Sequence, residues 1–155
     1  MNPDKKIRRL QSLLYTSGAG TILFSIWSAI RQIGIFQEAK KEFANMGLDD
    51  ISIIAIRVIW VLVLVLILGL FFLYVYIGLQ AMSVSLGKSK GSAYMIWAFL
   101  LILLSLLSYG HDLTALKISE WLRVDNVLTV VIDITANIIL GEVIVFSILL
   151  KKMRD

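Results

Sequence analysis

Three polar side chains interrupt the last long apolar run of the chain, which extends from residue 127 to residue 150. They are Asp133, Asn137 and Glu142. The run is long enough to cross a bilayer as a helix, because ~20 apolar residues span ~30 Å of hydrocarbon. Charged and amide groups are costly in that environment and are usually functional there, for example in ion passage or proton transfer. These three residues are therefore the first candidates for a functional site.

Helical spacing divides these polar residues between two faces. Thr129, Asp133, Asn137 and Gly141 recur at every fourth position and form one stripe. Glu142 points almost opposite to Asp133, because each residue of an α-helix advances by ~100°. One helix would then have to shelter polar groups on two sides. This demand predicts a surrounding helical bundle and self-association with a second copy of the protein.

A second polar stripe runs along the first apolar stretch of the chain. Its members are small, hydroxylated or charged residues at helical spacing, namely Ser17, Gly20, Thr21, Ser25, Ser28, Arg31 and Gln32. Small residues and hydroxyls are typical of a packing seam between membrane helices. The arginine and the glutamine at the end of the stripe instead indicate that the stripe lines a hydrated cavity. Both interpretations remain open.

The two stripes are expected to meet. If both faced lipid, their polar groups would lack water and hydrogen-bond partners. We therefore predict that the first and last helices pack together. The contact would place Ser17, Thr21, Ser25 and Ser28 against Thr129, Asp133, Asn137 and Gly141.

The composition favours an integral membrane protein whose main partner is the lipid bilayer. Of the 155 residues, 59% are hydrophobic, against ~45–50% in typical soluble domains. The net charge of +4 arises from basic residues at the chain ends and in one short loop. No arginine-rich groove or aromatic platform accompanies them, so no nucleic acid is expected as a partner.

The sequence offers little material for an enzyme or a cofactor site. It has no cysteine and one histidine, His111, which cannot form a histidine metal cluster alone. No dense Asp/Glu motif is present for acid–base work. Gly87-Lys88-Ser89 resembles the end of a P-loop, but position 82 is methionine where that motif requires glycine. We expect no metal, nucleotide or other cofactor, and no enzymatic activity.

Four apolar runs predict an all-α integral membrane four-helix bundle that forms a single domain over residues 1–155. The expected spans are about 12–36, 51–80, 93–110 and 127–150. A short Gly/Ser-rich connection should make the second and third spans an antiparallel hairpin. The third is the most uniformly aliphatic and is expected to face lipid. The segment from 110 to 126 suits a short interfacial helix anchored by Trp121.

Basic residues in the chain ends and short loops predict the orientation. One side would carry Lys5, Lys6, Arg8, Arg9, Lys88, Lys90, Lys151, Lys152 and Arg154. The other side holds fewer basic residues and most of the acids. Because cytoplasmic loops are enriched in lysine and arginine, both termini are predicted to lie in the cytoplasm and the protein in the cell membrane.

This orientation places Arg31, Arg57 and Asp133 in the outer half of the membrane, although they come from three helices. A cluster of these charges is geometrically possible, either as a structural ion pair or as part of an ion path. Glu142 falls in the inner half, at the level of Ser17 and Thr21. A carboxyl group away from water favours its neutral form. It would serve either as a hydrogen-bond donor or as a proton-binding site.

Two classes of function follow from these residues. The first is a homo-oligomeric channel or transporter for an ion or proton, with Asp133, Asn137, Glu142, Arg31 and Arg57 along its path. The second is a non-transporting membrane binding protein, such as a toxin-immunity factor or an assembly or accessory subunit of a larger membrane complex. In that class the buried charges fix helix pairing. A pore should lose conductance when Asp133 or Asn137 is changed while the protein remains folded. A protein of the second class should instead fail to co-purify with its membrane protein partner.

Overall fold

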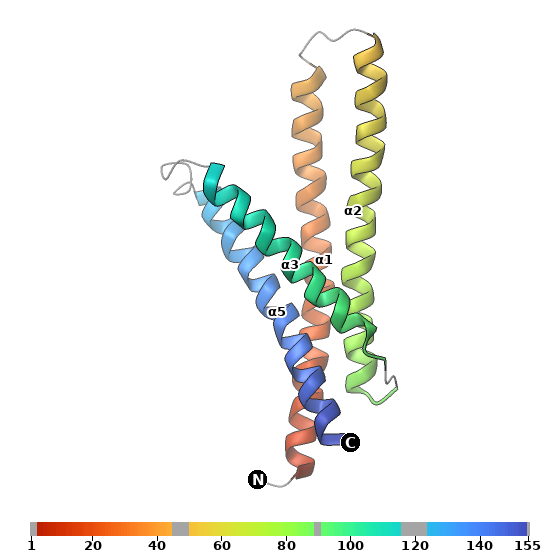
Figure 1. The fold of residues 1–155 in the computed structure, drawn as a ribbon, viewed down its shortest axis with the longest axis vertical. Helices are drawn as coiled ribbons and strands as arrows, with labels where there is room; N and C mark the ends of the chain where they lie inside the picture. Colours follow the sequence, from red (N-terminus) through yellow and green to blue (C-terminus); the bar gives the residue numbers. More distant parts are fainter. Residues whose placement is uncertain (1–2, 45–49, 89–90, 116–123, 155) are drawn as a thin grey trace.

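The chain folds into an all-helical bundle, as the apolar runs predict. The computed structural model describes residues 3–44, 50–88, 91–115 and 124–154. The helices in these ranges are α1 (Pro3–Ala44), α2 (Asp50–Ser85), α3 (Ala93–Ala115) and α5 (Val124–Arg154) (Figure 1). Three of them contain a segment long and apolar enough to cross a membrane, namely Asp4–Gly34, Ile54–Ser85 and Val130–Met153. The apolar segment of α3, Ala93–Leu107, is shorter.

The helices extend beyond the predicted spans. α1 begins at Pro3, a favourable first position because proline has no N–H and its fixed φ suits a helix. α3 continues past residue 110 to Ala115, and α5 begins before residue 127, at Val124. The predicted interfacial helix around Trp121 falls largely on residues 116–123, which lie outside the described residues.

The end of α2 is a Schellman motif. The backbone N–H of Lys88 donates to the carbonyl of Ser83 at 2.9 Å, and that of Gly87 donates to the carbonyl of Val84 at 3.0 Å. Gly87 has a φ of 75°, which glycine adopts without the steric cost that a side chain would impose. This motif ends α2 sharply, and α3 begins soon afterwards at Ala93.

The four helices form two pairs that converge at one end of the molecule. α1 and α2 lie side by side along their length, whereas α3 and α5 form a second pair inclined to the first (Figure 1). The start of α1 and the end of α5 lie at the end where the pairs converge (Figure 1). α2 and α3 do contact each other, but α3 contacts α5 more extensively.

The hydrophobic core lies where the two pairs converge, and all four helices contribute to it. Its buried members are Leu14, Ile77, Ala81, Tyr94, Ala98, Leu101, Leu140, Val143 and Leu150. Alanines in this set let the helices approach closely, and the larger side chains fill the space between them. The core therefore fixes how α1 and α5 cross.

Most of the apolar surface remains outside this core. In the middle of α2, Val61, Leu62 and Leu66 are each more than 60% exposed. Such extensive exposure of apolar side chains is exceptional for a soluble monomer and suits a lipid environment. α3 exposes Ile96 and Leu107 but buries Tyr94, Ala98 and Leu101. One face of α3 therefore packs against the rest of the bundle and the other is exposed, so its contact with lipid stays a prediction.

Candidate functional site

Glu142 of α5 is attached to α1 by a hydrogen bond. The hydroxyl of Ser17 donates to Glu142 Oε2 at 2.8 Å. Ser17 is 5% exposed, whereas Glu142 belongs to the exposed residues. The carboxyl group thus has one partner inside the helix contact and remains open to its surroundings on the other side. The two residues lie at the same level, as the helical rise predicts.

Asp133, on the same helix, is also attached to α1. Arg31 Nη1 donates to Asp133 Oδ1 at 3.0 Å and to Oδ2 at 3.2 Å. The side chains of Arg31 and Asp133 are 35% and 27% exposed, so this ion pair is only partly buried. Within the described residues, the structure shows no salt bridge for Arg57, which is exposed on α2. Of the three charges that were expected to cluster, Arg31 and Asp133 form an ion pair, and Arg57 has no salt bridge in the described part of the chain.

One helix contacts both carboxylates, although these residues point in nearly opposite directions on an ideal helix. α5 is inclined to α1 (Figure 1), and the long side chain of Arg31 reaches Asp133. One chain therefore provides a partner for each carboxyl group, although Glu142 remains exposed. Self-association stays a prediction.

Hydroxyl groups occupy α1 between the two carboxylate contacts. Thr21 and Ser25 are at most 1% exposed, and Ser28 is half-buried. The Thr21 hydroxyl donates to the Ser17 carbonyl at 2.9 Å, and the Ser25 hydroxyl donates to the Ile22 carbonyl at 2.6 Å. Each hydroxyl can still accept a further hydrogen bond. We call Ser17, Thr21, Ser25, Ser28 and Arg31 the polar face of α1.

Asn137 belongs to a different contact from the one that the stripe predicts. Its Nδ2 donates to Ser105 Oγ of α3 at 2.8 Å and to the Asp133 carbonyl at 3.1 Å. Ser105 therefore is not a lipid-facing hydroxyl. A second polar link between α3 and α5 is the hydrogen bond from the Tyr94 hydroxyl to Ser147 Oγ at 2.6 Å. Sequence reasoning missed Ser147, which resembles many other hydroxyl residues in the chain.

The small residues of the predicted seam have different environments. A Cβ built on Gly20 would lie 3.6 Å from Ile139 of α5, an ordinary packing distance. One built on Gly141 would meet nothing within 4 Å, so Gly141 is not a point of close helix contact. The side-chain contacts of Thr129 lie outside the described residues. In the described residues α1 is joined to α5 by Ser17–Glu142 and Arg31–Asp133, whereas Asn137 bonds to Ser105 of α3 and Gly141 is not a point of close contact.

A close approach of two helices involves glycines that the spacing argument did not select. A Cβ built on Gly78 would lie 2.6 Å from the backbone oxygen of Gly18, and one built on Gly18 would lie 2.8 Å from the backbone oxygen of Gly78. This contact joins α1 to α2. The sequence did contain a signal for this contact. Each glycine lies inside an apolar run, and small residues are common where membrane helices pack together.

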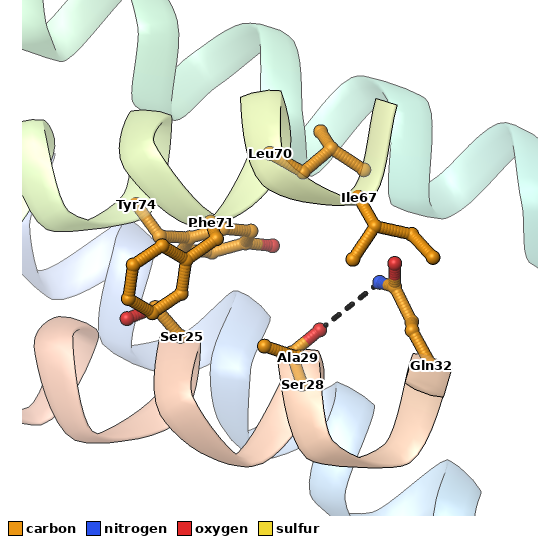
Figure 2. Close-up of a pocket in the computed structure, with 8 residues that line it drawn as sticks. All are labelled: Ser25, Ser28, Ala29, Gln32, Ile67, Leu70, Phe71 and Tyr74. Atoms are coloured by element: carbon orange, nitrogen blue, oxygen red, sulfur yellow. Dashed lines mark hydrogen bonds between the residues drawn. The ribbon is translucent and has the colours of Figure 1, made fainter. Parts of the chain in front are cut away.

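A small cavity lies between α1 and α2 beside the polar face (Figure 2). Its volume is ≈ 10 Å³, about the size that holds one water molecule. Its lining residues are Ser25, Ser28, Ala29, Gln32, Ile67, Leu70, Phe71 and Tyr74. α1 supplies a polar wall and α2 supplies an apolar wall with the single phenol of Tyr74 (Figure 2).

Comparison with protein-family models, with curated proteins and with solved structures finds no match for the chain. The function must then be argued from the site alone. Within the described ranges, no group of three or more His, Cys, Asp or Glu side chains could hold a metal ion. What the site does offer is two carboxyl groups, an arginine and a series of hydroxyls along one helix contact.

Proposed function

We propose that the protein is an integral membrane protein of the cell membrane that passes an ion or proton along the contact between α1 and α5. It would span the membrane four times, with both ends in the cytoplasm. The broad exposed apolar surface of α2 supports membrane insertion. The basic residues near the start of α1 and the end of α5 support the orientation.

One observation carries the transport proposal. Asp133 and Glu142 are both attached to α1, by Arg31 and Ser17 respectively. The two residues are nine positions apart along α5, which corresponds to ~13 Å of helix. This distance is close to half the ~30 Å hydrocarbon thickness. Hydroxyls of the polar face lie between them.

The groups have different roles in such a path. Glu142, which is exposed, would exchange an ion or proton with the inner side. Asp133 would bind the ion or proton at the outer end, in competition with Arg31. Thr21 and Ser25, which lie between them, donate to carbonyls of α1, and their oxygens can each still accept a hydrogen bond, so they would stabilise a positive charge in transit. Asn137 would hold α3 against this part of α5 through Ser105.

Ion and proton flux into liposomes tests the proposal. We expect purified protein to transport, and Asp133→Asn and Glu142→Gln to lower the flux by roughly tenfold or more. Thr135→Ala is the matched control, because Thr135 is exposed on the same helix and donates to the Val131 carbonyl of its own helix. Its flux should equal that of the wild type. A folded wild-type protein without flux would refute transport.

Self-association is a separate part of the proposal, and the mass of the protein in detergent tests it. A dimer or larger assembly would support a path completed by a second copy. A monomer that still transports would show that the α1–α5 contact of one chain suffices.

A second function, binding to another membrane protein, is favoured by Arg57. This exposed arginine lies in the apolar segment of α2, and the described residues provide no salt bridge for it. Within a membrane, an arginine side chain either extends its charged end to the aqueous interface or pairs with an acidic group. A photo-crosslinker placed at position 57 in native membranes would trap an adjacent protein if this function holds. Crosslinking only to lipid, beside measurable flux, would exclude it.

A further inference from the structure

Basic side chains occupy the end of the molecule where the two helix pairs converge. Figure 1 shows the start of α1, the α2–α3 turn and the end of α5 at this end. Within the described residues, each of these segments carries exposed lysine or arginine, namely Lys5, Lys6, Arg8, Arg9, Lys88, Lys151 and Lys152. We call this set the basic cluster.

The hydrophobic core joins the three segments. Ile7, which lies between the basic residues of α1, and Val84 of α2 both pack against the core, and Leu150 of α5 is a fully buried member of it. Lys151 directly follows Leu150, and Lys88 lies shortly after Val84. The basic cluster therefore borders the same end of the core from three segments of the chain.

The basic cluster carries an excess of positive charge. Over residues 3–9, 83–88 and 150–154, the only acidic residue is Asp4. None of the basic side chains of the cluster forms a salt bridge within the described part of the chain. The field of these side chains would attract a negatively charged partner to this end of the molecule.

Exposed apolar side chains lie close to the basic cluster along α1 and α5. Leu13 of α1 and Ile148 and Leu149 of α5 are 38%, 53% and 42% exposed. The segments Asp4–Gly34 and Val130–Met153, each long and apolar enough to cross a membrane, contain these residues together with the basic residues of α1 and α5. A phospholipid matches both features, because its acyl chains contact apolar side chains while its head group meets the charges. A nucleic acid would leave the apolar side chains in water.

We propose that the basic cluster binds the head groups of anionic phospholipids on the cytoplasmic side of the membrane. Lysine and arginine both bind phosphate, and arginine does so through two parallel N–H donors. Several basic residues next to a membrane helix attract anionic lipids, and each contributes to the affinity. The inference goes beyond the proposed transport, because it requires membrane insertion but no ion path. The flux assay and the lipid-binding test therefore fail independently.

The test measures which phospholipid the purified protein retains. Protein in a neutral detergent is mixed with equal amounts of phosphatidylglycerol and phosphatidylcholine, and native mass spectrometry counts each lipid on the protein. Inorganic phosphate, added in a separate arm, distinguishes a lipid site from a site for the free anion. A short oligonucleotide in a further arm tests nucleic acid as the partner.

Two double variants remove charge from the basic cluster, namely Arg8→Gln with Arg9→Gln and Lys151→Gln with Lys152→Gln. The matched control is Lys40→Gln with Lys41→Gln. These two lysines are also exposed, but they lie near the far end of α1, between Glu38 and Glu42 in the sequence. Helix content and detergent mass establish that all variants fold as the wild type does.

We expect the wild-type protein to retain phosphatidylglycerol in preference to phosphatidylcholine. Each double variant of the basic cluster should lower the affinity for phosphatidylglycerol by roughly tenfold or more, because it removes two charges that face the head groups. The control variant should keep the wild-type affinity, and inorganic phosphate at the concentration of the lipid should displace little of it.

Equal retention of the two lipids by the wild type would overturn the inference, as would an equal loss of affinity in the control variant. Displacement of phosphatidylglycerol by inorganic phosphate at the same concentration would show a site for the free anion and would also overturn it. Preferential retention of the oligonucleotide over phosphatidylglycerol would reassign the basic cluster to nucleic acid.

Discussion

The three polar side chains of α5, Asp133, Asn137 and Glu142, are each joined to a partner on another helix. Arg31 pairs with Asp133, Ser17 donates to Glu142, and Asn137 donates to Ser105. In a low-dielectric environment an unpaired polar group costs more than a new hydrogen bond contributes. These contacts therefore select one arrangement of the helices over others in which the same residues would face lipid alone.

The Arg31–Asp133 pair makes a prediction about stability. Replacing one partner, as in Arg31→Gln or Asp133→Asn, should lower stability, because the remaining charge loses its counter-ion. The expected loss is ~1–2 kcal/mol, between the values for exposed and for buried pairs, because the side chains are 35% and 27% exposed. The double variant should lose less than the sum of the two losses. Thermal unfolding in detergent micelles measures all three, and strictly additive losses would contradict the pairing.

At the scale of the elements, glycine and alanine decide which helices approach closely. Gly18 and Gly78 let the backbones of α1 and α2 come into contact, whereas the space beside Gly141 is open. Ser105 also has a defined place, as the acceptor for Asn137 between α3 and α5. Thr135, by contrast, is exposed and bonded to its own helix, so it serves as the reference substitution on α5.

Alanine substitutions on α2 test the helix contact. Gly78→Ala should destabilise the protein by ~1–3 kcal/mol, the usual cost of an overfilled contact. The reason is that the added methyl would lie 2.6 Å from both the Gly18 oxygen and the Ile22 side chain. Gly69→Ala is the control, because nothing lies within 4 Å of its added Cβ. Helix propensity favours alanine at both positions. Equal effects on thermal unfolding would refute close packing of α1 on α2.

At the scale of the whole molecule, the start of α1, the α2–α3 turn and the end of α5 occupy one end of the bundle (Figure 1). The other end of α1 lies far from them, because the 42 residues of this helix extend over ~63 Å. The converging helices place the core near the shared end. The exposed apolar surface of α2 covers much of the remaining length.

The proposed orientation predicts how introduced cysteines react. The chain has no cysteine, so each substitution creates a unique thiol. Cysteines placed at Lys6, Lys88 and Lys152 should all react with an impermeant reagent only after access to the cytoplasmic side. A cysteine at Lys41, near the far end of α1, should react from the outside. Labelling of Lys6 and Lys152 positions from opposite sides would rule out an even number of spans.

The sequence by itself determined the helices and the levels of their polar groups. Long apolar runs predict helices because each helix satisfies its own backbone hydrogen bonds locally. The fixed rise per residue predicted that Glu142 would lie at the level of Ser17, and the structure shows these two residues in contact. Arg31 and Asp133 were likewise assigned to one region from their positions along their helices.

Only the tertiary structure decided which neighbour each polar face meets. Asn137 shares a stripe with Asp133 but bonds to α3, whereas Asp133 pairs with Arg31 of α1. Both carboxyl groups of α5 contact α1, Glu142 through Ser17 and Asp133 through the long side chain of Arg31. Crossing angles depend on how side chains of two helices interlock. In this protein Gly18 and Gly78 bring α1 and α2 together, and the core to which all four helices contribute holds α5 against them, a property of the assembled bundle that no single stretch of sequence contains.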